Sequence, residues 1–195
     1  TLTGGTFTPG ATFNVAGNWT NMGGTLAPGT NTVTFTGTGA QAINGSATSQ
    51  TFYNVTLTKT AGTLLSVSGS TTSLTVNNFT ETTGNFTAPA TLDINGTLTL
   101  TAGTFTAGTN TEIGGNWTNM GGTFTPGSNT VTFNGTGAQA INGTAVAQTF
   151  GNLTVNKAAG VTLSVGGSTA ALTINNNFTE TLGNFTAPAT MTVSG

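Results

Sequence analysis

The chain has 195 residues, enough for one or two ordinary domains, but only 3% of them are charged, against about a quarter in a typical soluble domain. Two Lys or Arg stand against four Asp or Glu, the formal net charge is −2, and neither His nor Cys occurs. So few basic residues exclude an electrostatic nucleic-acid surface, the lack of Cys excludes disulfides, and no apolar run is long enough for a transmembrane helix.

Short segments with alternating apolar residues recur along the chain and predict β-strands. In chain order they are Val33–Phe35, Val55–Leu57, Leu65–Val67, Leu74–Val76, Leu92–Ile94 and Leu98–Leu100. Alternation places the apolar residues on one side of a strand and Thr on the other. Pro-Gly and Asn-Gly turn signals separate these segments, and no window has a helical period. We therefore predict an all-β chain with essentially no helix.

The two halves of the chain repeat one another. The string GNWTNMGG, which contains Trp19, returns around Trp117, so the offset is 117 − 19 = 98. An extra Asn near Asn177 moves the offset to 99, and about two thirds of the aligned positions are identical. We divide the chain into two copies of one unit, residues 1–98 and 99–195, and expect the second to continue the first.

A shorter repeat lies inside each unit. Phe86, Phe105 and Phe124 recur in related strings at a constant interval (105 − 86 = 19 and 124 − 105 = 19), whereas the segment 37–67 fits this interval poorly. A period of about 20 residues is too short for a domain, so each period must bury its apolar side against its neighbours. We predict a β-solenoid of about ten coils, stacked about 4.8 Å apart.

The alternative is a pair of tandem immunoglobulin-like β-sandwiches, because such a domain has about 100 residues. That architecture gives no reason for the shorter Phe interval inside a unit. It also requires a linker between the units, and none is visible from Leu98 to Gly108, where the string LTLTAGTFTAG continues the repeat. The solenoid is therefore the favoured fold.

Two recurring strings carry a resemblance to known surface proteins. Gly-Thr-Phe-Thr-Pro-Gly, at residues 5–10 and 122–127, and Asn-Gly-Thr-Leu-Thr-Leu-Thr, at residues 95–101, resemble the repeats of large bacterial surface proteins. These include tandem β-strand-repeat adhesins and the filamentous-haemagglutinin type of β-helix. The resemblance covers the whole chain and implies a secreted, right-handed parallel β-helix that acts as a stalk, adhesin or fibre. No functional residue is carried over, because the match is to scaffold positions.

The chain offers little for catalysis or metal binding. The absence of His excludes a Ser–His triad, and the absence of His and Cys excludes a zinc site. Among the carboxylates, Asp93 aligns with Thr192 and Glu112 with Asn14, so neither recurs in the other unit. We therefore predict no enzyme, no cofactor and no metal.

Lys59 and Glu81 do recur together, as Lys157 and Glu180, at similar separations (81 − 59 = 22 and 180 − 157 = 23). Because these separations are close to one coil, we expect an ion pair between adjacent coils, which contributes about 0–1 kcal/mol if it is exposed. A specific ligand site is the alternative.

Trp19 and Trp117 have two interpretations. Packing with the Phe residues inside the solenoid is favoured, because an aromatic side chain gains much from burial. Stacking on a carbohydrate ring is the functional alternative. Thr-x-Thr strings, such as residues 97–101, also allow an ice-binding face, although any outward strand face needs alternating Thr.

Asn-x-Ser/Thr glycosylation motifs occur 12 times. With so much Asn and Thr many arise by chance, and the same Asn residues are suited to turns and to Asn ladders. The candidate glycan attachment sites are Asn18, Asn54, Asn78, Asn85, Asn116, Asn152, Asn177 and Asn184.

Both ends of the chain follow the interior repeat, so we expect a processed product or an excerpt of a longer protein, with coils that can stack on other copies. We predict a structural, non-catalytic segment of an extracellular fibre or cell-surface stalk. Its expected partners are other copies of itself, end to end or side by side, and glycans, with no nucleic acid and no membrane insertion. A carbohydrate-binding adhesin module is the alternative.

Overall fold

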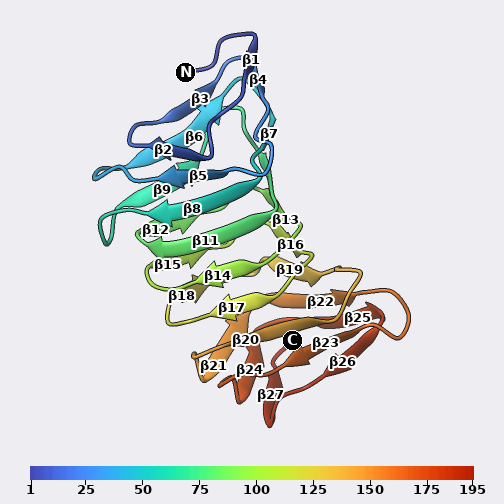
Figure 1. The fold of residues 1–195 in the computed structure, drawn as a ribbon. Coiled ribbons are helices and arrows are strands. Elements are labelled where there is room, and N and C mark those ends of the chain that lie inside the picture. The colour runs from blue at the N-terminus through green and yellow to red at the C-terminus, as the bar shows by residue number, and fades with distance from the viewer.

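The computed structural model describes all 195 residues as one column of stacked coils, with three short strands in each coil (Figure 1). Strands pair in parallel with the strand three positions later in the chain, apart from two breaks described below. No helix is present. The predicted all-β parallel β-solenoid is confirmed, and the pair of antiparallel sandwiches is wrong. The right hand predicted for the coil is the hand of nearly all connections between parallel strands of one sheet.

The coils give the column three faces. The first face holds β1 (Thr6–Phe7), β4 (Thr25–Leu26), β7 (Ser49–Thr51), β10 (Ser73–Val76), β13 (Thr91–Ile94), β16 (Asn110–Ile113), β19 (Thr130–Phe133), β22 (Asn152–Asn156) and β25 (Phe178–Leu182). The second face is one nine-stranded sheet of β2 (Thr12–Val15), β5 (Thr32–Phe35), β8 (Asn54–Thr58), β11 (Asn78–Thr83), β14 (Leu98–Leu100), β17 (Trp117–Asn119), β20 (Gln139–Gly143), β23 (Thr162–Val165) and β26 (Asn184–Thr186). The third face holds β3 (Trp19–Asn21), β6 (Gln41–Gly45), β9 (Leu64–Val67), β12 (Asn85–Thr87), β15 (Thr104–Thr106), β18 (Thr123–Thr125), β21 (Ala147–Phe150), β24 (Ala171–Ile174) and β27 (Thr190–Val193).

The chain makes nine coils, fewer than the ten or so predicted, because the coils differ in length. In the regular part, Phe86 pairs with Phe105, which gives a coil length of 105 − 86 = 19. In the part that fits this interval poorly, Gln41 pairs with Leu65, which gives a coil length of 65 − 41 = 24. The extra residues form corner loops, such as residues 36–40 between β5 and β6. They lengthen the coil without adding a strand.

The two repeats are related by a shift of fourteen strands, because β3 with Trp19 corresponds to β17 with Trp117. Since each coil has three strands, one repeat fills four and two-thirds coils. Equivalent strands therefore lie on neighbouring faces, with β3 on the third face and β17 on the second. The two breaks in pairing, between β4 and β7 and between β18 and β21, obey the same relation.

The boundary between the repeats lies inside a strand. Leu98 and Thr99 both belong to β14, which pairs with β11 of the first repeat, so that Phe79 lies opposite Leu98 and Thr80 opposite Thr99. No linker separates the two repeats, and the ladder crosses the boundary as it crosses any other pair of coils.

One apolar core of 30 buried residues runs through the coils. Aromatic rings form much of it: the ring centroids of Phe86 and Phe105 are 5.3 Å apart, and those of Trp117 and Phe150 are 4.9 Å apart. Each fully buried Phe or Leu side chain contributes about 1.5–3 kcal/mol. The constant interval between Phe residues in the sequence is therefore the spacing of rings that stack from coil to coil.

Candidate functional site

The most regular surface of the molecule is on the second face, and we call it the threonine face. It consists of the outward side chains of β5, β8, β11, β14 and β17. In each strand the apolar residues point inward, as Val33 and Phe35 do in β5, and Thr or Asn points outward. One row of outward residues is in register on five successive coils: Thr34, Thr56, Thr80, Thr99 and Thr118.

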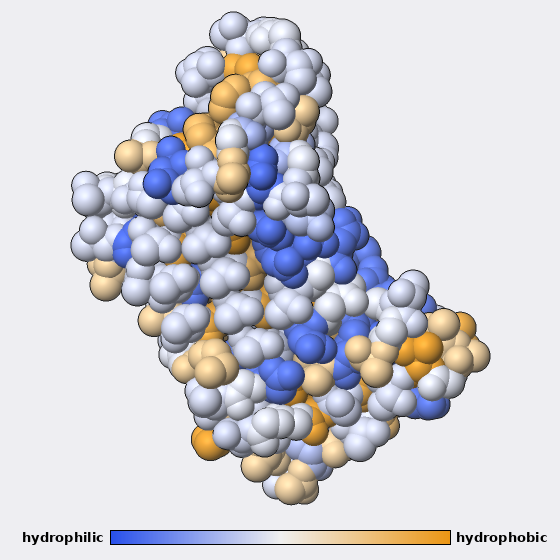
Figure 2. Space-filling view, viewed as in Figure 1, coloured by the Kyte–Doolittle hydropathy of each residue, from blue (hydrophilic) through white to orange (hydrophobic).

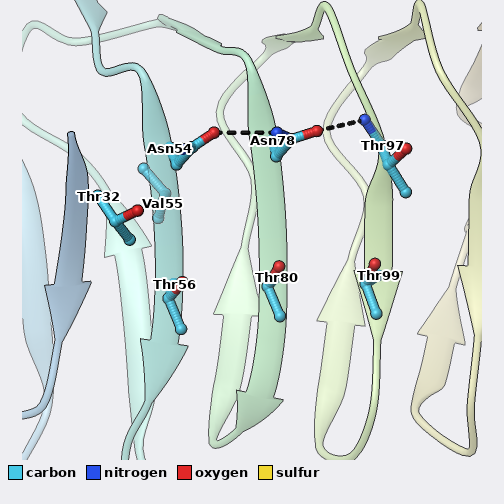
Figure 3. Close-up of a pocket in the computed structure, with 8 residues that line it drawn as sticks. All are labelled: Thr32, Asn54, Val55, Thr56, Asn78, Thr80, Thr97 and Thr99. Atoms are coloured by element: carbon cyan, nitrogen blue, oxygen red, sulfur yellow. Dashed lines mark hydrogen bonds between the residues drawn. The ribbon is translucent and has the colours of Figure 1, made fainter. Parts of the chain in front are cut away.

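A second row on the threonine face combines Thr with Asn (Figure 3). Asn54 pairs with Asn78 in the ladder, and the Nδ2 of Asn78 donates to the Oδ1 of Asn54 over 3.0 Å. The Oδ1 of Asn78 in turn accepts from the backbone N–H of Thr97 over 2.8 Å. The amides thus bond along the column axis, from one coil to the next. These bonds fix the orientation of the row.

The chemistry of the threonine face is hydrogen bonding without charge. Its outward positions hold only Thr and Asn, and each hydroxyl both donates and accepts. Successive coils place equivalent hydroxyls about 4.8 Å apart. Between the rows is a shallow hollow of about 280 Å³ that includes Thr32, Thr56, Thr80 and Thr99. Such a surface can bind a polar ligand, and it carries no side chain that transfers protons near neutral pH.

Most of the candidate glycan sites have side-chain amides that form hydrogen bonds with a neighbouring coil. An Nδ2 that already donates to a neighbouring coil is occupied, and this holds for Asn78, Asn85, Asn152 and Asn177. The Oδ1 atoms of Asn18 and Asn116 each accept from a backbone N–H of the next coil over 2.9 Å. Asn54 accepts from Asn78, and Asn184 is exposed. Glycosylation of these residues stays a prediction.

The two Trp residues lie in the core, as favoured above. Trp19 is 7% exposed and Trp117 is fully buried. The indole Nε1 of Trp19 donates to Gln50 over 2.6 Å, and that of Trp117 donates to Gln148 over 3.3 Å. The Trp117 ring has no face free for a carbohydrate, which argues against sugar stacking there. Trp19 is open only where it lines a small hollow at the first coil, and sugar stacking on Trp19 stays a prediction.

The expected ion pair between Lys59 and Glu81 is also wrong. The Nζ of Lys59 donates to the backbone oxygens of Gly37 and Gly39, over 2.9 and 2.8 Å, and to the Oε1 of Gln41 over 2.6 Å. Lys157 repeats this arrangement with its own Gly and Gln neighbours. Burial lowers the pKa of both lysines, and the carbonyl oxygens replace the water that burial removes.

Glu81 is buried without a partner. It is 1% exposed, and neither carboxylate oxygen has a hydrogen-bond partner. Burial raises its pKa to about 8, because the core disfavours the charged form. Its counterpart Glu180 lies in the last coil and is exposed. Glu81 is therefore a proton-bearing core residue at neutral pH.

Asp93 and Glu112 lie opposite one another on the outer side of the first face, on β13 and β16. The Oε2 of Glu112 accepts from Asn134 over 2.8 Å, and burial raises the pKa of Asp93. Like charges directly opposite destabilise a sheet. The pair is not part of a larger acidic group, since no cluster of three or more His, Cys, Asp or Glu side chains is present.

The sequence analysis missed the glutamines, which are the buried partners of the recurring lysines and tryptophans. The chain has four, and Gln41 and Gln50 recur at the same offset as Gln139 and Gln148. All four are buried and bonded to the core lysines or tryptophans. Recurrence of so rare a residue beside a recurring Lys was the available signal.

Comparison of the chain with family models, curated proteins and solved structures found no match to any of them. The structure contains no helix that is long and apolar enough to cross a membrane.

Proposed function

We propose that this chain is a structural, non-catalytic segment of an extracellular fibre or cell-surface stalk, built by stacking β-solenoid repeats. The observation that supports this most is the boundary between the repeats. There, β11, β12 and β13 of the first repeat pair with β14, β15 and β16 in the same register as coils within a repeat. Because one repeat continues into the next without a linker, additional repeats would extend the same column into a rod.

The mechanism of such a rod is passive. Parallel ladders join coil to coil by backbone hydrogen bonds along the axis, and the continuous apolar core resists bending and unwinding. Nine coils about 4.8 Å apart make a rod about 43 Å long. With both lysines and Glu81 buried, the outer wall carries only three charged side chains, Asp93, Glu112 and Glu180, so the repulsion that keeps rods apart is weak.

Location and assembly can be tested together on the source cells. Antibodies raised against the purified chain are used for immunogold labelling of intact and permeabilised cells. Labelling of filaments outside intact cells, with a diffraction spacing near about 4.8 Å along their axis, supports the proposal. Label that appears only after permeabilisation contradicts it.

A carbohydrate-binding adhesin module is a second candidate, because the threonine face presents two rows of hydroxyl and amide groups in register. A periodic polar surface suits a periodic ligand, such as an extended polysaccharide. The test is binding to a glycan array and to insoluble polysaccharides. Loss of binding on changing Thr56, Thr80 and Thr99 together to Val supports this candidate, because Val keeps the shape and removes the hydroxyl. Retention of glycan binding by that variant contradicts a role for these hydroxyls.

A further inference from the structure

The last coil of the chain presents apolar residues that its counterpart in the first repeat buries. Phe178, Phe185 and Met191 are only partly buried, and Leu182 and Val193 are 52% and 42% exposed. Their counterparts one repeat earlier include three fully buried residues, Phe79, Phe86 and Leu92. Nothing in the chain covers β25, β26 and β27 on this side.

The first coil is open in a complementary way. Leu2, Phe7 and Phe13 are partly buried, and with Thr1 and Trp19 they line an apolar hollow of about 210 Å³. Figure 2 shows hydrophobic residues at the surface near the first coil and again near the last coils. Counterparts of Leu2 and Phe7, which are Leu100 and Phe105, are buried by the coil before them.

The chain itself contains the joint that would close both openings. At the boundary between the repeats, Glu81 lies opposite Leu100, Phe86 opposite Phe105, and Asp93 opposite Glu112. The first members of these pairs correspond to Glu180, Phe185 and Thr192, and the second members correspond to Leu2, Phe7 and Asn14. The open surface at one end and the open surface at the other are thus the two halves of an interface that already exists inside the molecule.

We infer that a second copy of this chain docks its first coil on the last coil of the first copy, in the register of the internal joint. Phe185 then lies opposite Phe7 of the second copy, Thr192 opposite its Asn14, and Val193 opposite its Val15. This inference rests on the fibre function proposed above and specifies its partner and joint. Each repeat fills four and two-thirds coils, so the two repeats of one chain fill nine and one-third. Each docked copy would therefore be rotated about the column axis by a third of a turn relative to the copy before it. The threonine face would then appear on all three sides over three copies.

The register is testable by disulfide cross-linking, because the chain has no Cys. Thr192 and Asn14 are both exposed, point outward and lie at opposite ends, so the variant Thr192→Cys/Asn14→Cys cannot close on itself. Residues directly opposite on neighbouring parallel strands lie about 4.8 Å apart, within the range that a disulfide spans. Oxidation is followed by non-reducing gel electrophoresis, which is expected to show a ladder of covalent oligomers that a reductant collapses to monomer.

The chain provides matched controls. Asp93→Cys/Glu112→Cys places the same pair at the internal joint, where the disulfide forms within one molecule and calibrates the yield. Thr190→Cys/Asn14→Cys is two residues out of register, because Thr190 corresponds to Thr91, which lies opposite Asn110, the counterpart of Thr12. Ladder formation several-fold above this out-of-register variant supports the inference, and equal yields from the two variants overturn it.

A second measurement does not depend on cysteine. Phe185→Asp places a charge on the proposed joint, and Met120→Asp places one on a residue that is 45% exposed away from both end coils. Light scattering is expected to show loss of self-association only for Phe185→Asp. Equal association of the two variants overturns the inference. Filaments on cells whose subunits do not cross-link in this register would leave the fibre function standing and refute only the joint.

Discussion

The Nζ of Lys59 and the Oε1 of Gln41 are 2.6 Å apart in a buried hydrogen bond, and Lys157 and Gln139 form the same bond one repeat later. The Nε2 of Gln41 also donates to the backbone oxygen of Val15 over 2.9 Å. Three successive coils are therefore tied together through one Gln and one Lys. We call the two side chains and their hydrogen bonds the node. It lies where residues 36–40 lengthen the coil, and it holds this loop in place, because the loop belongs to no strand.

Lys59→Met is expected to lower the free energy of unfolding by about 3 kcal/mol. The methionine keeps the apolar stem but leaves the backbone oxygens of Gly37 and Gly39 without a donor, while the Oε1 of Gln41 keeps only its bond from the N–H of Gly37. Hydrogen bonds to a buried charge are the costly ones to lose. Urea denaturation measures the change. Lys157→Met is the matched variant in the second repeat and is expected to cost a similar amount. A loss below about 0.5 kcal/mol for both would show that the node is dispensable.

Removal of Glu81 is expected to change how stability depends on pH. Burial raises the pKa of Glu81 to about 8 from an ordinary value of 4.5, so the folded chain holds this proton more tightly than the unfolded chain. The stabilisation is complete below pH 4.5 and is lost as pH rises through 8, to a total of up to about 5 kcal/mol. Glu81→Leu continues the row formed by Leu57 and Leu100 and should flatten this dependence.

Denaturation curves between pH 4 and pH 9 test this expectation. The variant should be more stable than the unchanged chain above pH 8, where the latter must bury a carboxylate. Thr80→Leu is the control, because Thr80 is the outward neighbour of Glu81 in β11 and is not ionisable, and it should leave the pH dependence as it was. An unchanged slope for Glu81→Leu would mean that Glu81 keeps an ordinary pKa.

The sequence predicts which segments are strands, which of their side chains point into the core, and that the coils stack. The first two depend on local alternation, and the third depends on the spacing of Phe86 and Phe105. The number of coils does not, because a corner loop adds residues without adding ladder. Residues 36–40 lengthen a coil, and alternation carries no information about such a loop. The shift of fourteen strands between the repeats is likewise invisible until the strands are counted in three dimensions.

The same effect explains the incorrect ion pair. The separation of Lys59 and Glu81 (81 − 59 = 22) is close to the length of an average coil. The coil at this point is longer, because Glu81 lies opposite Leu57 (81 − 57 = 24). The backbone N–H of Lys59 instead donates to the oxygen of Thr83. This small difference in coil length is enough to separate two side chains that an average period brings together.

Gly103→Ala is expected to destabilise the chain by about 3 kcal/mol or more. Gly103 has a φ of +95°, and a Cβ added there would lie 1.7 Å from the backbone oxygen of Gly84 in the preceding coil. Thermal unfolding followed by circular dichroism measures the loss. Gly166→Ala is the control, because no atom lies within 4 Å of its added Cβ, and the change there should be neutral or slightly stabilising. Equal melting temperatures for the two variants would contradict the close packing of coils at this corner.

Thr111→Val is expected to stabilise the chain by about 1–2 kcal/mol. Thr111 is fully buried, lies opposite Leu92 on one side and Val131 on the other, and its hydroxyl has no hydrogen-bond partner. An unsatisfied buried hydroxyl costs about 1–3 kcal/mol, and Val replaces it with a methyl group of similar size in a row of apolar neighbours. Thr99→Val is the control, because Thr99 points outward and its hydroxyl reaches water, so its stability should change by less than about 0.5 kcal/mol. If Thr111→Val lowers the midpoint of urea denaturation, the hydroxyl must have a partner in the core, and the apolar ladder along the first face would not be continuous at β16.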